Sequence, residues 1–170
     1  NFQRPDYRLA EQCAQNGGFG WFIVFLDASQ KMLSIGIAQE AADGDLRPLE
    51  YANKSWNKTE IHWDVKVKEL RSHVIFCEEY WCMVKGFPTV ILHDHRSNSP
   101  NELEKALVSH QISAKIRRWI IKMMPTLHSA FYGHIDGENN IWADGLSRFM
   151  ASAKIESLSQ LPCPLKKKIH

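Results

Sequence analysis

The fold is decided by one stretch, Trp21-Phe22-Ile23-Val24-Phe25-Leu26-Asp27-Ala28-Ser29. Its first six residues are apolar, are mostly aromatic or β-branched, and follow a glycine-rich segment at 17–20, a pattern typical of a strand buried on both faces of a sheet. Asp27 therefore stands at the exit of a central strand. A single acid in that place is most often a surface residue that ends the strand, so its meaning depends on whether other acids occupy matching places.

Hydrophobic periodicity predicts four more strands around this central one. Leu33, Ile35 and Ile37 alternate with small or polar residues, which indicates an antiparallel strand with one buried face. The polar segment 41–46 predicts a hairpin turn into the next strand. In chain order, the five predicted strands cover 21–26, 31–39, 47–55, 89–92 and 127–135.

The same sequence predicts helices where the apolar period changes from two to about 3.6. Asp64 is a suitable N-cap for a helix over 65–80, and Glu69 lies beside the apolar stripe of that helix. Ser99 and Glu102 form a capping-box pattern for a helix over 100–109. Ser113 opens a helix over 114–124 that we expect Pro125 to end, and a last helix is predicted over 141–151.

Strands and helices in this order indicate a single α/β domain with a mixed sheet. The length of 170 residues and the hydrophobic content of 44% fit one domain with a sizeable core. We expect residues 1–19 to be a lead-in outside that core, 20–152 to form the domain, and 153–170 to be a tail. The absence of an initiator Met suggests a piece cut from a longer polypeptide.

Charge and cysteine content limit the classes of function. The formal net charge is only +2, from 21 Lys and Arg against 19 Asp and Glu, so any nucleic-acid binding has to be local. The four cysteines are irregularly spaced and include no CxxC pair, which argues against a zinc site or a disulfide framework and for free thiols in a reducing compartment. No apolar run is long enough to predict a membrane span.

Four acids occupy places that suggest a shared site. Asp27 and Asp94 follow apolar strands, Glu69 lies on a helix that borders the core, and Asp144 lies at the start of the last predicted helix. Carboxylates gathered from separate elements repel one another and resist desolvation unless cations hold them. The cluster therefore predicts a hard divalent metal, most simply Mg²⁺, and two such ions bridged by one Asp suit phosphodiester hydrolysis.

Six short motifs follow one another in a characteristic order. They are Leu26-Asp27-Ala28-Ser29, Tyr51-Ala52-Asn53-Lys54-Ser55, Lys68-Glu69-Leu70, His93-Asp94-His95-Arg96, Arg118-Trp119 and the closing run Asp136-Gly137-Glu138-Asn139-Asn140-Ile141-Trp142-Ala143-Asp144-Gly145-Leu146-Ser147-Arg148. With this ordered set the chain resembles the ribonuclease H domain of gypsy-type LTR retrotransposon Pol polyproteins. Each motif alone is weak, and the ordered set covers about residues 21–149.

The resemblance implies a fold, a reaction and partners. The expected fold is a ribonuclease H-like α/β fold, a five-stranded mixed sheet of order 3-2-1-4-5 flanked by helices. The expected reaction is endonucleolytic hydrolysis of the RNA strand of RNA/DNA hybrids during reverse transcription, with two Mg²⁺ ions for which Mn²⁺ can substitute. The expected partner is the reverse transcriptase domain of the same polyprotein, and the expected location is intracellular, in a cytoplasmic virus-like particle or in the nucleus.

The resemblance also implies a role for each acid. Asp27 corresponds to the residue that bridges both metal ions, and Glu69 and Asp94 to ligands of the metal that stabilises the leaving 3′-oxygen. Asp144 corresponds to the acid that supports the metal activating the attacking water. The chain departs from the family pattern at His93, where Thr is usual, at Asp136, where Pro is usual, and at Gly145, where Ala is usual, and none of these changes removes a ligand.

Several histidines and cations allow more than one interpretation. His93 and His95 flank Asp94, but successive side chains of a strand point to opposite faces, so both histidines would face away from Asp94 and a zinc site is disfavoured. A structural role is favoured for His134. Lys115, Arg117 and Arg118, with Lys122, form a basic helix face that either contacts a nucleic-acid backbone or is simply solvated.

A second class of function stays open. A non-catalytic ribonuclease H-like module, domesticated or decayed, would serve in binding or scaffolding. Retention of all four acids favours the nuclease, because a decayed copy has no physical reason to keep mutually repelling carboxylates.

Overall fold

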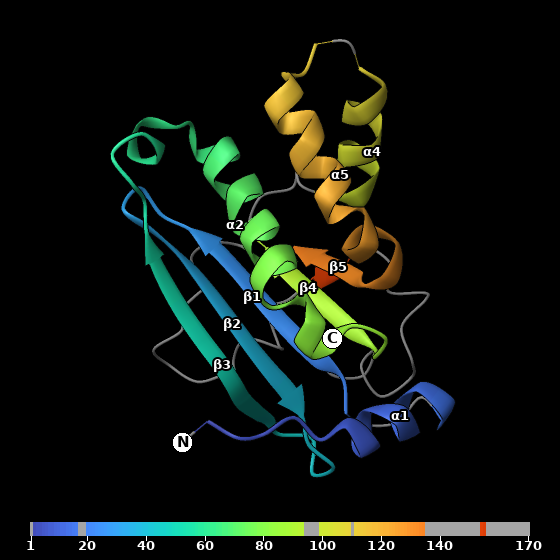
Figure 1. The fold of residues 1–170 in the computed structure, drawn as a ribbon. Helices are drawn as coiled ribbons and strands as arrows, with labels where there is room; N and C mark the ends of the chain where they lie inside the picture. Colours follow the sequence, from blue (N-terminus) through green and yellow to red (C-terminus); the bar gives the residue numbers. More distant parts are fainter. Residues whose placement is uncertain (1, 17–19, 94–98, 110, 135–153, 156–170) are drawn as a thin grey trace.

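One mixed sheet forms the centre of the molecule (Figure 1). The computed structural model describes residues 2–16, 20–93, 99–109, 111–134 and 154–155. Within those residues the strands are β1 (Phe22–Ala28), β2 (Met32–Glu40), β3 (Leu46–Ser55), β4 (Thr89–His93), β5 (Phe131–His134) and β6 (Lys154–Ile155). Their order in the sheet is β3-β2-β1-β4-β5-β6. The predicted order 3-2-1-4-5 is confirmed, and the short β6 adds a strand beside β5 that the sequence did not predict.

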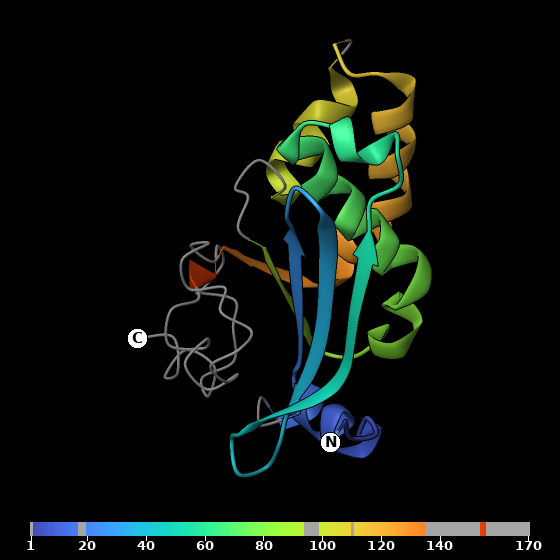
Figure 2. The same ribbon diagram turned by 90° about the vertical axis from the view of Figure 1, so that its left-hand side faces the viewer.

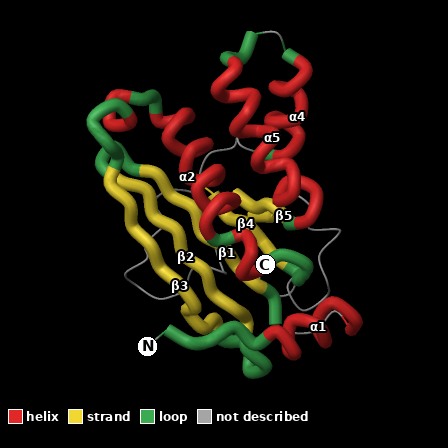
Figure 3. Tube along the Cα trace, in the orientation of Figure 1, coloured by secondary structure: helices red, strands yellow, loops and turns green. Residues whose placement is uncertain are grey.

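The helices that follow β3 lie on one side of this sheet. They are η1 (Glu60–His62), α2 (Val65–Glu79), α3 (Trp81–Val84), α4 (Pro100–Val108) and α5 (Ala114–Ser129), and α1 (Tyr7–Asn16) precedes β1. The turned view shows α2, α4 and α5 on the same side of the strands (Figure 2), and the trace shows α2 running across them (Figure 3). None of the described helices is long and apolar enough to cross a membrane.

Burial confirms the central position of β1. Residues 22–26 are at most 2% exposed, so the strand is covered on both faces as its continuous apolar run predicted. β1 pairs antiparallel with β2 and parallel with β4. Phe22, Val24 and Leu26 belong to the core cluster that also contains Leu70 and Val74 of α2. Burial of this α2 face fixes the helix across β1.

Three predicted N-caps are confirmed. The Asp64 carboxylate accepts the backbone N–H of Lys66 at the start of α2. Ser99 and Ser113 accept backbone N–H groups in the same way at the starts of α4 and α5. Each cap satisfies a helix-terminal donor that would otherwise lack an intrahelical partner, which fixes where each helix begins.

The prediction that Pro125 ends its helix is wrong, because α5 continues to Ser129. A proline inside a helix removes one backbone hydrogen bond. Here the last turn compensates through burial of Thr126 and Leu127, and the Thr126 hydroxyl donates to the Met123 carbonyl at 2.7 Å. The fifth strand accordingly begins at Phe131 and not at residue 127.

The expectation that residues 1–19 lie outside the core is also wrong. Ala10 of α1 is fully buried, and Tyr7 stacks on Phe87 with ring centroids 5.1 Å apart. The Asp6 N–H donates to the Gln39 side-chain oxygen, and the Gln39 amide donates back to the Asp6 carbonyl, both at 2.8 Å. These contacts attach α1 to the end of the sheet where β1 begins (Figure 1).

A glycine makes this attachment possible. Gly20 has a φ of +109°, and a Cβ at this position would lie 2.6 Å from the carbonyl oxygen of Leu9 in α1. Real Cβ atoms do not approach backbone oxygens so closely, so any side chain here would push α1 away from the sheet. Gly86 also has a positive φ, of +89°, but a Cβ there would meet nothing within 4 Å.

This pair of glycines provides a matched test. We expect Gly20→Ala to lower the free energy of unfolding by about 3 kcal/mol, from backbone strain together with the clash. Gly86→Ala should cost only the strain, about 1 kcal/mol. Urea denaturation of both variants measures the difference, and equal losses would contradict the packing of α1 against Gly20.

Candidate active site

β1 and β4 end side by side, and this end of the sheet carries the candidate site. The parallel register of these two strands ends with the pair Leu26 and His93. Asp27 is the next residue of β1, is half-buried, and pairs with Ser34 of β2 on the other side. In α/β sheets, reactive groups gather where parallel strands end, because loops and helix termini converge there. Asp27 occupies such a place in the middle of the sheet.

Glu69 reaches the same strand end from α2. Its side chain is only 3% exposed, and its Oε1 accepts the backbone N–H of Ala28 at 3.1 Å. Ala28 directly follows Asp27, so the Glu69 carboxylate lies next to the backbone that carries Asp27. A hydrogen bond to an ionised acceptor is stronger than a neutral one, and it offsets part of the cost of burying the carboxylate.

Lys68 joins the loops around the end of β1, a role that was not predicted from the sequence. Its ammonium donates to the carbonyls of Gln30, at 3.0 Å, and Ile61, at 2.9 Å, and the residue is only 3% exposed. The β1–β2 turn and η1 are thereby tied to α2. Lys68 belongs to the Lys68-Glu69-Leu70 motif, which marks the residue as notable. The spacing of residues in the sequence does not show that this lysine is buried and bonded to two carbonyls.

The structure describes two of the four predicted acids. Asp94 and Asp144 lie outside the described residues, as do His95 and the predicted helix over 141–151. Asp27 and Glu69 belong to the same end of the sheet, because Glu69 bonds to the N–H of Ala28, the residue after Asp27. In the part of the chain that the structure describes, no group of three or more His, Cys, Asp or Glu side chains forms a metal site. The assignment of all four acids as ligands thus stays a prediction.

A buried chain of hydrogen bonds lies one helical turn beyond Glu69. His73 Nε2 and the Tyr132 hydroxyl are 2.9 Å apart, and that hydroxyl donates to Thr126 Oγ1 at 3.0 Å. Thr126 in turn donates to the Met123 carbonyl. Because each hydroxyl carries a single proton, the proton between His73 and Tyr132 must come from His73 Nε2. The chain therefore runs in one direction, from α2 through β5 to α5.

Burial sets the protonation states of His73 and Tyr132 in this chain of hydrogen bonds. It lowers the pKa of His73 to about 3, with a smaller contribution from the neighbouring His93. It also raises the pKa of Tyr132 well above its ordinary value. Both groups are accordingly neutral at physiological pH.

The rings of His73, His93 and Tyr132 also form one cluster. Their centroids are 5.3 Å apart for His73 and Tyr132, 6.1 Å for His93 and Tyr132, and 6.5 Å for the two histidines. His93 is 2% exposed, so this departure from the family pattern is a packed residue at the end of β4.

The basic face of α5 is largely committed to contacts within the protein. Lys115 Nζ lies 3.4 Å from the ring centroid of Trp63 and 4.7 Å from that of Trp119, and partial desolvation lowers its pKa. The Arg117 guanidinium donates to the carbonyls of Leu107 and Ser109. Arg118 is exposed. Lys115 and Arg117 thus have structural contacts, and Arg118 is the best placed of the three for the predicted nucleic-acid contact.

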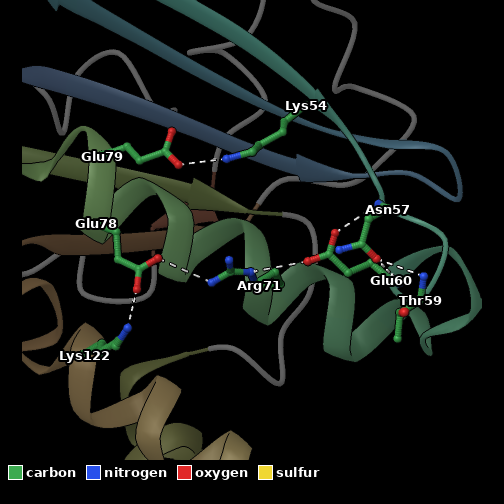
Figure 4. Close-up of polar contacts among 8 residues, drawn as sticks. All are labelled: Lys54, Asn57, Thr59, Glu60, Arg71, Glu78, Glu79 and Lys122. Atoms are coloured by element: carbon green, nitrogen blue, oxygen red, sulfur yellow. Dashed lines mark hydrogen bonds and ion pairs between the residues drawn. The ribbon is translucent and has the colours of Figure 1, made fainter.

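Arg71 of α2 links this helix to η1 (Figure 4). Its guanidinium lies 3.8 Å from Glu60 and 3.4 Å from Glu78, and Glu78 also pairs with Lys122 of α5. Isolated surface pairs contribute little, but this set is partly buried and connects three elements. It helps to fix α2, and hence Glu69, relative to α5 and η1.

Comparison with solved structures identifies the fold class as ribonuclease H-like. A foamy viral protease-reverse transcriptase, termed dRH, in complex with double-stranded DNA matches with a TM-score of 0.52 and 17% identity over 78% of this chain and 21% of that one. A second foamy viral protease-reverse transcriptase complex with double-stranded DNA matches with a TM-score of 0.51 and 20% identity, over 66% of this chain and 23% of that one.

Ribonuclease H1 of the archaeon Halobacterium salinarum NRC-1 matches with a TM-score of 0.50 and 14% identity, over 79% of this chain and 95% of that one. At these identities the likeness establishes the fold alone. The chain spans only about a fifth of the length of the foamy viral proteins. No curated protein sequence matches it.

A family model identifies the chain more closely. The model of the RNase H-like domain found in reverse transcriptase matches residues 20–125, so the chain belongs to that family. The matched region contains Asp27, Glu69 and Asp94, and Asp144 lies beyond its end.

The bond between Glu69 and Ala28 can be tested by comparing two substitutions. Glu69→Gln keeps an oxygen that can accept the Ala28 N–H, so we expect the free energy of unfolding without divalent metal to stay within about 0.5 kcal/mol of wild type. Glu69→Ala leaves that N–H without its acceptor and should cost about 2 kcal/mol. Urea denaturation in EDTA measures both values.

Glu79 provides the control on the same helix. It is exposed and paired with Lys54, so Glu79→Ala should change stability by less than about 1 kcal/mol. If Glu69→Ala were as stable as Glu69→Gln, the hydrogen bond would not fix the position of Glu69.

Proposed function

We propose that this chain is the ribonuclease H domain of a gypsy-type LTR retrotransposon Pol polyprotein. It acts as a divalent-metal-dependent endonuclease that hydrolyses the RNA strand of RNA/DNA hybrids during reverse transcription. Membership of the reverse transcriptase RNase H-like family and the ordered motifs support this proposal. The observation that carries it is the Glu69 carboxylate bonded to the N–H of Ala28, directly beside Asp27.

The residues at this strand end suit Mg²⁺. Hard divalent cations prefer carboxylate and carbonyl oxygens, and Asp27 and Glu69 offer carboxylate oxygens from two rigid elements, β1 and α2. Oε1 of Glu69 accepts the Ala28 N–H, which holds this carboxylate at the end of β1. A divalent cation bound by both residues would also offset the repulsion between two carboxylates at the same strand end.

In the proposed site Asp27, Glu69, Asp94 and Asp144 hold two metal ions. When bound, such ions supply an activated water and stabilise the charge that develops on the leaving oxygen. Asp27, on the central strand, would be the ligand that the two ions share. Glu69 adds an oxygen from α2, and its bond to Ala28 limits its rotation. The last described residue before Asp94, His93, pairs with Leu26, the residue before Asp27.

The remaining parts of the proposal concern substrate and context. An RNA/DNA hybrid presents 2′-hydroxyls on one strand only, and this shape difference is what the enzyme would recognise. Arg118 is a candidate contact to the backbone of the hybrid. The natural partner is the reverse transcriptase domain of the same polyprotein, in a cytoplasmic virus-like particle or in the nucleus.

A cleavage assay tests the proposal directly. The purified chain is incubated with a strand-labelled RNA/DNA hybrid in Mg²⁺ or Mn²⁺, with RNA/RNA and DNA/DNA duplexes alongside. We expect internal cuts confined to the RNA strand of the hybrid. Asp27→Asn and Glu69→Gln should each lower the rate at least about 100-fold, because each removes a charge that would hold the metal.

Matched substitutions away from the site separate charge loss from general damage. Asp43 is exposed in the β2–β3 turn, and Glu79 is exposed at the far end of α2. Asp43→Asn and Glu79→Gln should cleave within about twofold of wild type. A well-folded wild-type chain that leaves the hybrid intact in both metals would contradict the proposal and favour a non-catalytic module.

A further inference from the structure

The buried chain from His73 to Thr126 lies close to the proposed metal site. Glu69 and His73 are four residues apart on α2, so they occupy the same face of the helix one turn apart. Both are buried, at 3% and 1% exposure. Any rotation or translation of α2 that moves the Glu69 carboxylate also moves the His73 ring.

The first two steps of this chain of hydrogen bonds each cross to another element. His73 of α2 donates to Tyr132 of β5, Tyr132 donates to Thr126 of α5, and Thr126 donates to the Met123 carbonyl within α5. The rings of His73 and Tyr132 also contact His93 at the end of β4. Hydrogen bonds therefore join α2, β5 and α5, and ring packing adds β4. The β4 residue in this cluster, His93, directly precedes Asp94 and pairs with Leu26, which precedes Asp27.

Stability alone does not explain why a core position should hold this polar chain. Buried polar groups cost free energy when any partner is missing, and apolar residues of similar size often stabilise a core as well or better. What a fully bonded chain adds is fixed geometry, because each donor and acceptor allows only a narrow range of positions.

We infer that the His73–Tyr132–Thr126 chain is a positioning network that sets the distance between Glu69 and the ends of β1 and β4 for divalent-metal binding. The inference rests on the proposed function. Tyr132 and Thr126 act through α2 and do not themselves contact the metal. Outer residues that orient metal ligands typically change metal affinity by about 10-fold to 100-fold when they are replaced.

Calorimetric titration of Mg²⁺ into the metal-free protein tests the network without relying on catalysis. Tyr132→Phe and Thr126→Val each remove one hydroxyl with little change in volume. We expect each substitution to raise the Mg²⁺ dissociation constant about 10-fold, measured at a temperature where circular dichroism shows that the variant is folded. Thr126→Ser keeps the hydroxyl and should bind Mg²⁺ within twofold of wild type.

Tyr7→Phe is the control for loss of a tyrosine hydrogen bond elsewhere. The Tyr7 hydroxyl donates to the Met83 carbonyl near α1, so its loss should leave Mg²⁺ affinity within twofold of wild type. Affinities of folded Tyr132→Phe and Thr126→Val within twofold of wild type would overturn the inference while leaving the proposed function intact. A wild-type chain that binds no Mg²⁺ would overturn both.

Discussion

The hydrogen bond from the Ala28 N–H to Glu69 is the interaction on which the candidate site depends. It joins the central strand to the helix that crosses it, and it does so beside Asp27. A buried carboxylate is tolerated only where hydrogen bonds or cations compensate its lost hydration. The surrounding contacts keep α2 in place for this bond: the Asp64 cap, the Lys68 ammonium, the Arg71 ion pairs and the His73 chain.

Those features of the fold that arise from local signals could be predicted from the sequence. The apolar run of β1, the alternation in β2 and the caps Asp64, Ser99 and Ser113 all depend on residues close together in the chain. The extension of α5 through Pro125 could not be predicted, because burial of Thr126 and Leu127 by distant residues outweighs the local preference. The packing of α1 could not be predicted either, because it depends on contacts with Gln39 and Gly20 that the sequence of the helix itself does not reveal.

In the candidate site, too, some features could be predicted from the sequence and others could not. Asp27 and Glu69 were predicted from their places after an apolar strand and beside an apolar helix stripe, and from motif resemblance. The contacts of Lys115 with Trp63 and Trp119, and of Arg117 with two carbonyls, were not, since outward-facing cations look alike in a sequence. The His73, Tyr132 and Thr126 chain joins positions up to 59 residues apart, which no local pattern reveals.

The proposed function requires the end of β1 and the first half of α2 to form one divalent-metal site. Paramagnetic broadening by substoichiometric Mn²⁺, followed residue by residue in amide spectra of the isotope-labelled chain, tests this most directly. We expect the amides of Asp27, Ala28 and Glu69 to broaden first. Earliest broadening at Glu60, Glu78 and Glu79, the carboxylates paired with Arg71, Lys122 and Lys54, would contradict it.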